Sequence, residues 1–366
     1  MPEVKQILKK AEDSVEISPE EALTLLKLTG KDFAGLQKVA DQICFEKKNN
    51  LVTFVVNRNI NFTNICYQGC KFCSFSVSNK EKESFLKTLE EIRGDIINAK
   101  NAGCTEVCIQ GGINPELNFD YYLDILKNVK VIDSNMHTHA FSPQEVFHMS
   151  KIYGTSIKNV LKDLKKAGLD SMPGTAAEIL VDEIRRVICP NKITTSQWID
   201  VIKSAHNLGI PTTSTMMYGH IEDLHDRIEH LEVLRNIQKE TSGFTEFVPL
   251  SFVSEKPLLS KLSKYPLKPS YGMADLKLFS VARIFFNNYI DNIQCSWVKL
   301  GPKFAQVSLN YGVNDFSGTL MEENISKSAG AEFGEYLSPE EIIEIIKAAG
   351  KRPAQRDTLY NILEFY

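Results

Sequence analysis

The chain has 366 residues, which is long for one ordinary domain but fits one α/β barrel with a small extension. Hydrophobic residues make up 43% and charged residues 24%, as in globular proteins, and the net charge of −4 gives no sequence-wide attraction to nucleic acid or to an anionic membrane. No apolar run approaches the ~20 residues of a membrane span, and the N-terminus lacks a signal-peptide core. We therefore expect a cytoplasmic protein whose cysteines remain thiols.

The first 48 residues have a helical pattern. Ser18 to Glu21 form a capping box with proline at the first helical position, and Gly30 ends that helix. Residues 31–48 predict a second amphipathic helix. We interpret residues 1–48 as an N-terminal helical cap that packs against a barrel; the simpler alternative is a plain structural extension.

From Leu51 onward, strand patterns alternate with helix patterns. We expect strands at 51–56, 105–110, 136–140, 169–172, 212–217, 246–250, 293–298 and 317–320. We expect helices from Thr88 to Ala102 and at 119–131, 143–167, 176–188, 195–208, 224–239, 273–288 and 302–311. Several helices end in Ala-Gly or Leu-Gly just before a strand, where glycine accepts the left-handed conformation.

This alternation indicates parallel βαβ units. Counting roughly eight of them predicts a closed (β/α)8 barrel, of the TIM-like α/β class, over residues 49–330, with a partial barrel of six units as the alternative. Residues 331–366 would form a C-terminal helical segment packed on the barrel. In either architecture, the active site lies in the loops that follow the carboxyl ends of the strands.

Three cysteines follow the first strand closely. Cys66, Cys70 and Cys73 have the spacing C-x3-C-x2-C. An iron–sulfur cubane takes four ligands, one for each iron, so this run would leave one iron open. An open metal position is where substrate chemistry takes place, whereas a closed site is structural or carries electrons.

The spacing leaves other interpretations open. Structural zinc needs four Cys or His ligands, and the nearest histidine is His137, far downstream. A ferredoxin-type carrier needs a fourth cysteine in register, usually followed by proline, but Ser74 and Phe75 follow here. Coincidence is a third alternative, because Cys104 and Cys108 also have the spacing C-x3-C; we interpret both as small core residues.

Several residues at strand ends are further candidates. Gly111-Gly112 could let a ligand approach the backbone closely, or could simply form a tight turn. His137 and His139 share one face of the third strand, and with His220 they are candidates for acid–base catalysis that the sequence does not rank. We expect His225 and His230, on the following helix, to be at the surface.

The last two units contribute a second set of polar and aromatic candidates. At the barrel mouth they could bind an aromatic amino acid and a polar heterocycle. The alternative is that the tryptophan is a core residue and the aspartate a turn residue. These residues are Trp297, Lys299, Asn314, Asp315 and Thr319.

The cysteine run, with Phe72 just before its last cysteine, resembles the radical S-adenosylmethionine (SAM) superfamily. The resemblance implies that Cys66, Cys70 and Cys73 bind a [4Fe-4S] cluster whose open iron binds SAM. It also implies that the reduced cluster cleaves SAM to methionine and a 5′-deoxyadenosyl radical.

The resemblance further implies roles in binding SAM. Gly111 and Gly112 would hold its amino group, although Ile113 stands where glutamate is usual. Glu178 could bond its ribose, the alternative being that the preceding Pro-Gly-Thr only begins a helix. Residues 215–222 resemble the adenine-lining pattern G-x-I-x-G-x-x-E, with Gly219 in register, Thr215 in place of the first glycine, and Met217 (alternatively a core residue) in place of isoleucine.

Further motifs narrow the resemblance. I-N-F-T-N-I-C at 60–66 and K-F-C-S-F at 71–75 are similar to the group that builds deazaflavin and futalosine-route menaquinone. The segments 172–180, 210–220, 296–301 and 314–323 are similar to the CofH-type family of FO (deazaflavin) synthase subunits, whereas the menaquinone branch shows Pro-Gly-Gly-Gly where this chain has Pro-Gly-Thr-Ala. Tyr67-Gln68-Gly69, between the first two cysteines, departs from the family at positions that are not ligands.

The resemblance implies a reaction and its partners. The radical would take hydrogen from L-tyrosine, and the released 4-hydroxybenzyl group would add to carbon 5 of 5-amino-6-(D-ribitylamino)uracil. A CofG-type second subunit would then close the deazaflavin ring, and an external donor would supply electrons. The alternatives are a menaquinone-route radical enzyme, and a non-catalytic iron–sulfur or zinc protein.

Overall fold

The computed structural model describes residues 2–322 and 324–366. Met1 and Glu323, which belong to the predicted N-terminal block and to the 314–323 motif, lie outside the described residues. The strands are β1 (Leu51–Val55), β2 (Asn57–Asn61), β3 (Glu106–Gln110), β4 (His137–Ala140), β5 (Thr212–Tyr218), β6 (Phe244–Ser251), β7 (Asp315–Gly318), β8 (Arg352–Arg356) and β9 (Ile362–Phe365).

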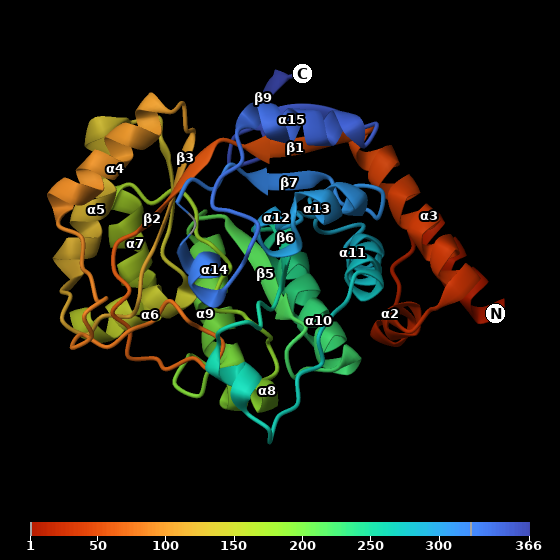
Figure 1. Cartoon of the computed structure of the whole chain (residues 1–366), viewed down its shortest axis with the longest axis horizontal. Coiled ribbons are helices and arrows are strands. Elements are labelled where there is room, and N and C mark those ends of the chain that lie inside the picture. Colours follow the sequence, from red (N-terminus) through yellow and green to blue (C-terminus); the bar gives the residue numbers. More distant parts are fainter. Residues whose placement is uncertain (1, 323) are drawn as a thin grey trace.

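The helices surround these strands (Figure 1). They are α1 (Pro2–Glu12), α2 (Pro19–Leu26), α3 (Gly30–Lys48), α4 (Leu89–Asn101), α5 (Phe119–Ile132), α6 (Pro143–Tyr153), α7 (Ile157–Ala167), α8 (Asp182–Ile188), α9 (Thr195–Asn207), α10 (Leu224–Thr241), α11 (Met273–Phe285), α12 (Trp297–Leu300), α13 (Pro302–Ser308), α14 (Asn324–Ala329) and α15 (Pro339–Ala348), with a 3-10 turn at Leu258–Lys261.

The strands close into a parallel barrel. β1 and β2 follow one another and together form the first position, with β2–β3–β4 pairing in parallel on one side and β7 pairing with β1 on the other. Single bridges carry the wall through Ser171 and Met172 to β5, β5 pairs with β6, and further bridges through Ile293 and Gln294 reach β7. This ring of eight positions confirms the (β/α)8 prediction over the partial barrel.

Two expected strands are shorter than predicted. The segments 169–172 and 293–298 contribute only isolated bridges, and residues 297–300 form α12 instead. Pro173 follows the first segment at once and cannot donate to a ladder, while Ser296 begins a helix in the second. Each segment therefore leaves the wall after one or two residues.

Local signals position many of the helices correctly. The capping boxes Ser18/Glu21 and Thr88/Glu91 are both present. Gly168 ends α7 in the left-handed conformation, with φ of 119°. One prediction, the helix 176–188, is wrong in its first half, because the helix begins only at Asp182.

An arginine explains this irregular segment. The Arg185 guanidinium, which is buried, donates hydrogen bonds to the carbonyls of Ala176, Ala177 and Ile179. These carbonyls therefore do not bond along a helix. Ala176 and Glu178 also have positive φ values of 69° and 48°, which a right-handed helix does not allow.

The N-terminal block lies on the outer wall of the barrel. α3 packs on α11, and α2 packs on α10 and α11, at the flank opposite α4 and α5 (Figure 1). Arg235 of α10 holds this block by donating to the Ile17 carbonyl at 2.8 Å. The block packs against the barrel as expected, but none of its described residues lines the central cavity.

The C-terminal segment differs from its prediction. Residues 331–366 contain one helix, α15, and two strands, so the expected helical segment is wrong. β8 pairs in parallel with β1, with Leu51 opposite Arg352, and β9 pairs with β8 in antiparallel. β3 pairs with β2 and not with β1, and the edge of β1 from Leu51 to Phe54 pairs with β8 instead.

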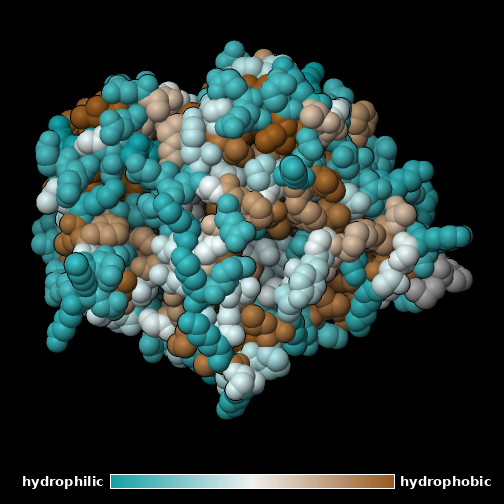
Figure 2. All heavy atoms as spheres, viewed as in Figure 1, coloured by the Kyte–Doolittle hydropathy of each residue, from teal (hydrophilic) through white to brown (hydrophobic). Residues whose placement is uncertain are grey.

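In the described ranges, no helix combines the length and the apolar character that crossing a bilayer requires. Figure 2 shows hydrophilic residues over most of the visible face, with hydrophobic residues in small groups between them.

Candidate functional site

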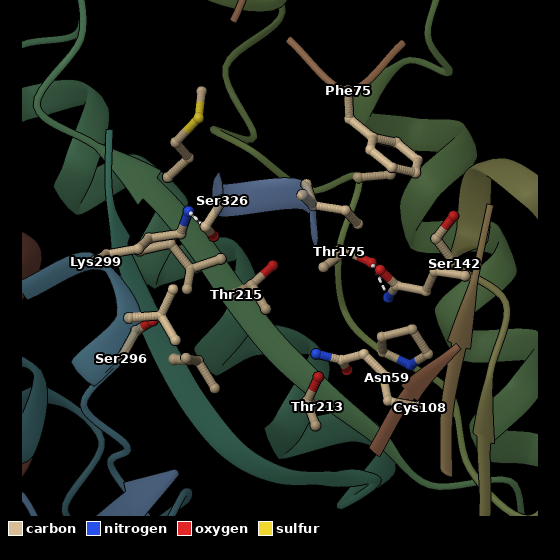
Figure 3. A pocket seen from close by; sticks show the side chains of 18 of the residues that line it. Asn59, Phe75, Cys108, Ser142, Thr175, Thr213, Thr215, Ser296, Lys299 and Ser326 are labelled. Atoms are coloured by element: carbon tan, nitrogen blue, oxygen red, sulfur yellow. Dashed lines mark hydrogen bonds between the residues drawn. The ribbon is translucent and has the colours of Figure 1, made fainter. Parts of the chain in front are cut away.

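A cavity of about 410 Å³ opens at the carboxyl ends of the barrel strands. Figure 3 shows side chains from opposite walls pointing into it, with Phe75 at one end and Asn59, Cys108 and Thr213 at the other. Its lining includes Cys66, Cys70 and Cys73 together with Phe72, Gly111, Gly112, Glu178 and Met217. The structure thus brings most of the predicted site residues into one space.

The three cysteines face this cavity from the loop after β2. The Cys73 amide donates to the Cys70 carbonyl at 3.1 Å, which forms a tight turn, and the Lys71 amide donates to the Ile188 carbonyl at 2.8 Å. All three are free thiols and partly exposed to the cavity. Burial raises the pKa of Cys70 and Cys73, and nearby Lys192 opposes that effect on both.

Gly111 and Gly112 pack closely against the residues that lead into this loop. The Gly112 amide donates to the Thr63 carbonyl at 2.8 Å, and a Cβ at Gly112 would lie 2.3 Å from the Ile65 carbonyl oxygen. A Cβ at Gly111 would lie 2.5 Å from the Phe62 ring. Both glycines line the cavity. The two interpretations offered above, a tight turn and a backbone that a ligand can approach closely, therefore describe the same feature.

A buried carboxyl group lies beside these glycines, and the sequence did not single it out. Glu145 is the third residue of α6, where it closes a capping box with Ser142, and its other oxygen accepts from the Gly111 amide at 3.1 Å. Burial raises the pKa of Glu145 to about 7. The capping-box pattern Ser-Pro-Gln-Glu after a strand was the available signal. Ile113 is buried and supplies no carboxylate, as expected.

Glu178 meets a lysine rather than open solvent. Its carboxylate lies 2.5 Å from the Lys192 ammonium, and both side chains are 13% exposed. Burial would lower the pKa of Lys192, but Glu178 and the Cys70 thiol outweigh burial and raise it. Lys192 also lies 5.3 Å from the centroid of the Phe72 ring, so this ion pair is part of the wall beside the cysteines.

Only one of the three candidate histidines reaches the cavity. His139 lines it, and its Nδ1 lies 2.7 Å from the Ser171 hydroxyl, which His137 Nε2 contacts at the same distance. Burial lowers the pKa of His139 to about 4 and also lowers that of His137. His137 and His220 are not among the cavity-lining residues.

His220 has a structural environment. It is fully buried, its Nε2 lies 3.1 Å from the Met217 carbonyl, and its Nδ1 accepts from the Ile221 amide. The expectation for His230 was wrong: it is buried, and its Nδ1 accepts from the Leu180 amide at 2.9 Å. His225 is exposed, as expected.

The segment 215–222, which resembles the adenine-lining pattern, contributes two side chains to the cavity wall. Thr215 and Met217 line the cavity, whereas Gly219 does not. Gly219 has a φ of 85°, and its amide donates to Glu222 at 2.6 Å, so it serves the turn after β5.

The candidate residues from the last two strand–helix units do not all reach the cavity. Lys299 lines the cavity and donates to the Ser326 hydroxyl at 3.0 Å (Figure 3). Trp297 is a core residue whose indole donates to the Gly318 carbonyl. The remaining three are buried in hydrogen-bond networks: Asn314 accepts from Arg283, Asp315 pairs with Arg356, and Thr319 bonds Asn57.

Charged groups form the floor of the cavity. Arg356 of β8 pairs with Asp315 at 2.5 Å and lies 3.6 Å from Glu246 of β6. Burial raises the pKa of Glu246, against the opposing effect of Arg356. Arg356 and Glu246 line the cavity with Glu106, whose carboxylate accepts from Asn57 and Thr358. No local pattern indicates this floor, because it joins residues that are far apart in the chain.

Two further cysteines, Cys108 and Cys189, lie close enough to be considered as additional ligands. Cys108 lines the cavity, so only Cys104 is the expected core residue; β3 turns Cys108 toward the barrel interior. Burial is the main reason for the raised pKa of Cys70; Lys192 lowers that pKa, and Cys189, which precedes Pro190, is near enough to raise it further. Cys189 is itself buried and does not line the cavity. Among the described residues, the loop after β2 therefore offers three cavity-facing thiols, and Cys108 faces the same cavity from β3.

These residues fit an iron–sulfur cluster. The donors are three soft thiols, the ligand type that such clusters use. In the described part of the chain, no three His, Cys, Asp or Glu side chains converge tightly enough to hold a single metal ion. A cubane instead takes one thiolate for each iron, so separate thiols around one cavity suit it.

The fold and the cysteine-lined cavity define a radical SAM enzyme. The family model of the radical SAM superfamily matches residues 60–234, and that of the CofH/MqnC C-terminal region matches residues 241–366. Among solved structures, HydG, a maturase of the [FeFe]-hydrogenase, has a TM-score of 0.76 at 19% identity, covering 96% of this chain and 76% of its own. Methylornithine synthase (PylB) has a TM-score of 0.74 at 17% identity, covering 95% and 97%.

More similar relatives identify the particular family within the radical SAM class. The 5-amino-6-(D-ribitylamino)uracil–L-tyrosine 4-hydroxyphenyl transferase of Archaeoglobus fulgidus is 53% identical over 89% of this chain and 93% of its own. The enzyme of the same name from Methanocaldococcus jannaschii is 51% identical over 95% and 98%. The chain belongs to this family of transferases.

Proposed function

We propose that the protein is a radical SAM transferase that fragments L-tyrosine and joins its 4-hydroxybenzyl group to 5-amino-6-(D-ribitylamino)uracil, in the biosynthesis of the deazaflavin FO. The observation that carries this proposal is the 51–53% identity to transferases of that name over 89–95% of the chain. The cysteine-lined cavity supports it, because it supplies a site where the chemistry could occur.

Cys66, Cys70 and Cys73 would hold a [4Fe-4S] cluster through their thiolates, and SAM would bind beside it. When bound, the cluster and SAM would supply the radical chemistry that activates tyrosine. The chain's own residues enclose this space: Phe72, Gly111, Gly112 and Met217 form the wall next to the cysteines and would contact SAM.

The rest of the cavity would bind the two substrates. Phe75 lines the cavity, and the floor carries Glu106, Glu246 and Arg356. Aromatic side chains suit stacking on flat rings, and the charged floor suits hydroxyl and amino groups. A walled cavity of this kind positions the reacting groups and keeps water and stray hydrogen donors away from a radical.

His139 is the histidine that we retain as a proton acceptor. It faces the cavity, and its pKa of about 4 keeps the imidazole neutral at physiological pH. Glu178 lines the cavity, and its carboxylate, paired with Lys192 through Oε1, would bond the SAM ribose.

A menaquinone-route radical enzyme is the second candidate, and one observation favours it. The matching C-terminal family model is shared by CofH and MqnC. The full-length relatives at about half identity decide for the tyrosine transferase. A CofG-type subunit, closing the ring, and an external electron donor would be the protein's partners.

The test is an anaerobic assay of the reconstituted, reduced enzyme with SAM, tyrosine and 5-amino-6-(D-ribitylamino)uracil, analysed by mass spectrometry. We expect 5′-deoxyadenosine and a 4-hydroxybenzyl–pyrimidine adduct that forms only when both substrates are present. 5′-Deoxyadenosine without that adduct would overturn the substrate assignment. Absence of SAM cleavage from a fully loaded cluster would overturn the radical SAM mechanism.

A further inference from the structure

The loop between β6 and α11 is basic and lies next to the cysteine run. Residues 252–272 contain four lysines (256, 261, 264 and 268) and one glutamate, a net charge of +3, whereas the whole chain carries −4. All four lysines are exposed. We call residues 252–272 the basic loop; it includes the 3-10 turn Leu258–Lys261 and forms the lower edge of the molecule in Figure 1.

The basic loop contacts the cysteine run directly. The Leu259 amide donates to the Lys71 carbonyl at 2.8 Å, and Leu259 is fully buried at this contact. The Lys71 ammonium lies 6.0 Å from the centroid of the Tyr265 ring. Lys71 stands between Cys70 and Cys73, so it adds a positive charge next to two of the cysteines.

Lys71 and Leu259, which make this contact, do not line the cavity. Phe72 and Cys73 face the cavity, whereas Tyr67 is 52% exposed and Gly69 is exposed as well. A macromolecule seated on the basic loop would therefore approach the cysteines from outside. The cavity would stay open for SAM and the substrates.

Exposed apolar side chains accompany the lysines. Leu258 is 55% exposed within the basic loop, Tyr271 is 75% exposed near its end, and Met273 begins α11 with 57% exposure. A few apolar anchors among like charges are typical of protein-docking surfaces, and charge complementarity speeds such encounters. Encounters in electron transfer bury little surface, so a loop of this size suffices.

We propose that the basic loop and Lys71 form the docking surface for an acidic one-electron carrier protein. This inference rests on the proposed function, which requires a reduced cluster. One electron would pass from the reduced carrier to the oxidised cluster, so the carrier is oxidised by one electron and no covalent bond changes. Among the partners of such an enzyme, the electron donor is the one that must approach the cluster closely, which is where these charges lie.

The experiment measures electron transfer rather than turnover. Chemically reduced flavodoxin, an acidic flavoprotein, is mixed anaerobically with enzyme that carries the oxidised cluster, and flavin oxidation is followed by stopped flow. The variant is K256E/K261E/K264E. The control is K158E/K162E/K166E, which reverses three exposed lysines of α7 and changes the net charge equally. Dithionite replaces flavodoxin in a parallel series.

We expect the basic-loop variant to slow flavodoxin oxidation by about tenfold or more at low salt, and added salt to slow the wild type toward the variant. The α7 control should stay within about twofold of the wild type, and dithionite should reduce all three proteins at similar rates. Carbodiimide cross-links should join flavodoxin carboxylates to Lys256, Lys261 or Lys264.

Equal flavodoxin rates for variant and wild type, an equal loss in the α7 control, or cross-links confined to other lysines would each overturn the docking proposal. Failure of the proposed function is distinguishable from these outcomes. It would appear as absent SAM cleavage after dithionite reduction, whatever the flavodoxin rates are.

Discussion

Glu145 accepts a hydrogen bond from the Gly111 amide at 3.1 Å, and this contact places a buried carboxyl group against the turn that seals the cysteine loop. Its pKa of about 7 in the folded protein lies above the ordinary value of 4.5, because burial favours the neutral form. The folded state therefore binds this proton more tightly than the unfolded chain does. The associated stability is complete below pH ~4.5 and is lost as the pH rises through about 7.

We expect Glu145→Gln to flatten the pH dependence of stability. The wild type should lose on the order of 3 kcal/mol of unfolding free energy through this group between pH 4.5 and pH 8, and the variant should lack that part of the slope. Urea denaturation of the cluster-free protein at several pH values measures it. Glu91→Gln is the matched control: Glu91 occupies the same capping-box position at the surface, and hydrogen bonds from Thr88 lower its pKa. Parallel slopes for Glu145→Gln and wild type would contradict the prediction.

Removing single cysteines should separate ligands from neighbours. Cys70→Ala should lose the reconstituted cluster and all SAM cleavage, because Cys70 faces the cavity. Cys189→Ser should keep both, because Cys189 is buried and does not line the cavity. Iron and sulfide content and visible absorbance measure the outcome. Cluster loss in Cys189→Ser would indicate a fourth cysteine ligand and revive the carrier interpretation. SAM cleavage retained by Cys70→Ala would instead refute the assignment of Cys70 as a cluster ligand.

The Lys192–Glu178 pair should respond strongly to the loss of one partner. Lys192→Met would leave the Glu178 carboxylate buried without a counterion, at a cost of roughly 3–5 kcal/mol in unfolding free energy. Glu178→Gln in the same chain should recover most of that loss. Lys127→Met is the control, because the exposed Lys127–Asp124 pair should contribute less than ~1 kcal/mol. Similar losses for Lys127→Met and Lys192→Met, from denaturation curves of the cluster-free protein, would refute the expectation.

Gly112→Ala should disturb the cysteine loop. The new methyl group would lie 2.3 Å from the Ile65 carbonyl oxygen, so the loop must move, at a cost of roughly 1–3 kcal/mol and with lower cluster loading. Gly94→Ala is the control within α4, where a Cβ meets nothing within 4 Å and should stabilise the helix by up to ~1 kcal/mol. Denaturation and iron content test both variants. A Gly112→Ala protein as stable and as well loaded as wild type would contradict the close approach.

Much of the fold follows from local patterns. Helix starts at Ser18 and Thr88, the helix end at Gly168, and the alternation of strands and helices are all read within a few residues. The cysteine run and the two glycines also lie next to strands that the pattern predicts. The step from the cysteine pattern to a radical SAM transferase came from the family resemblance, and the relatives confirm that resemblance.

Other features depend on contacts that no local pattern contains. The helix expected from Ala176 fails because Arg185 takes its carbonyls, and His230 is buried because the Leu180 amide needs an acceptor. The cavity floor joins Glu246 to Arg356 across more than a hundred residues. Such pairs form only once the barrel has closed, so composition and periodicity cannot reveal them.

The pairing of β8 with β1 has a consequence for how the chain is made. Leu51 lies opposite Arg352, so one of the first strands to leave the ribosome must wait for one of the last. During synthesis, the nascent chain holds β1 with an unfilled edge and lacks Arg356, the cation that neutralises Asp315. The charged floor of the cavity can therefore mature only after the chain has emerged through Arg356, about 300 residues after the cysteine loop, so we expect cofactor insertion to follow the synthesis of this whole stretch rather than accompany it.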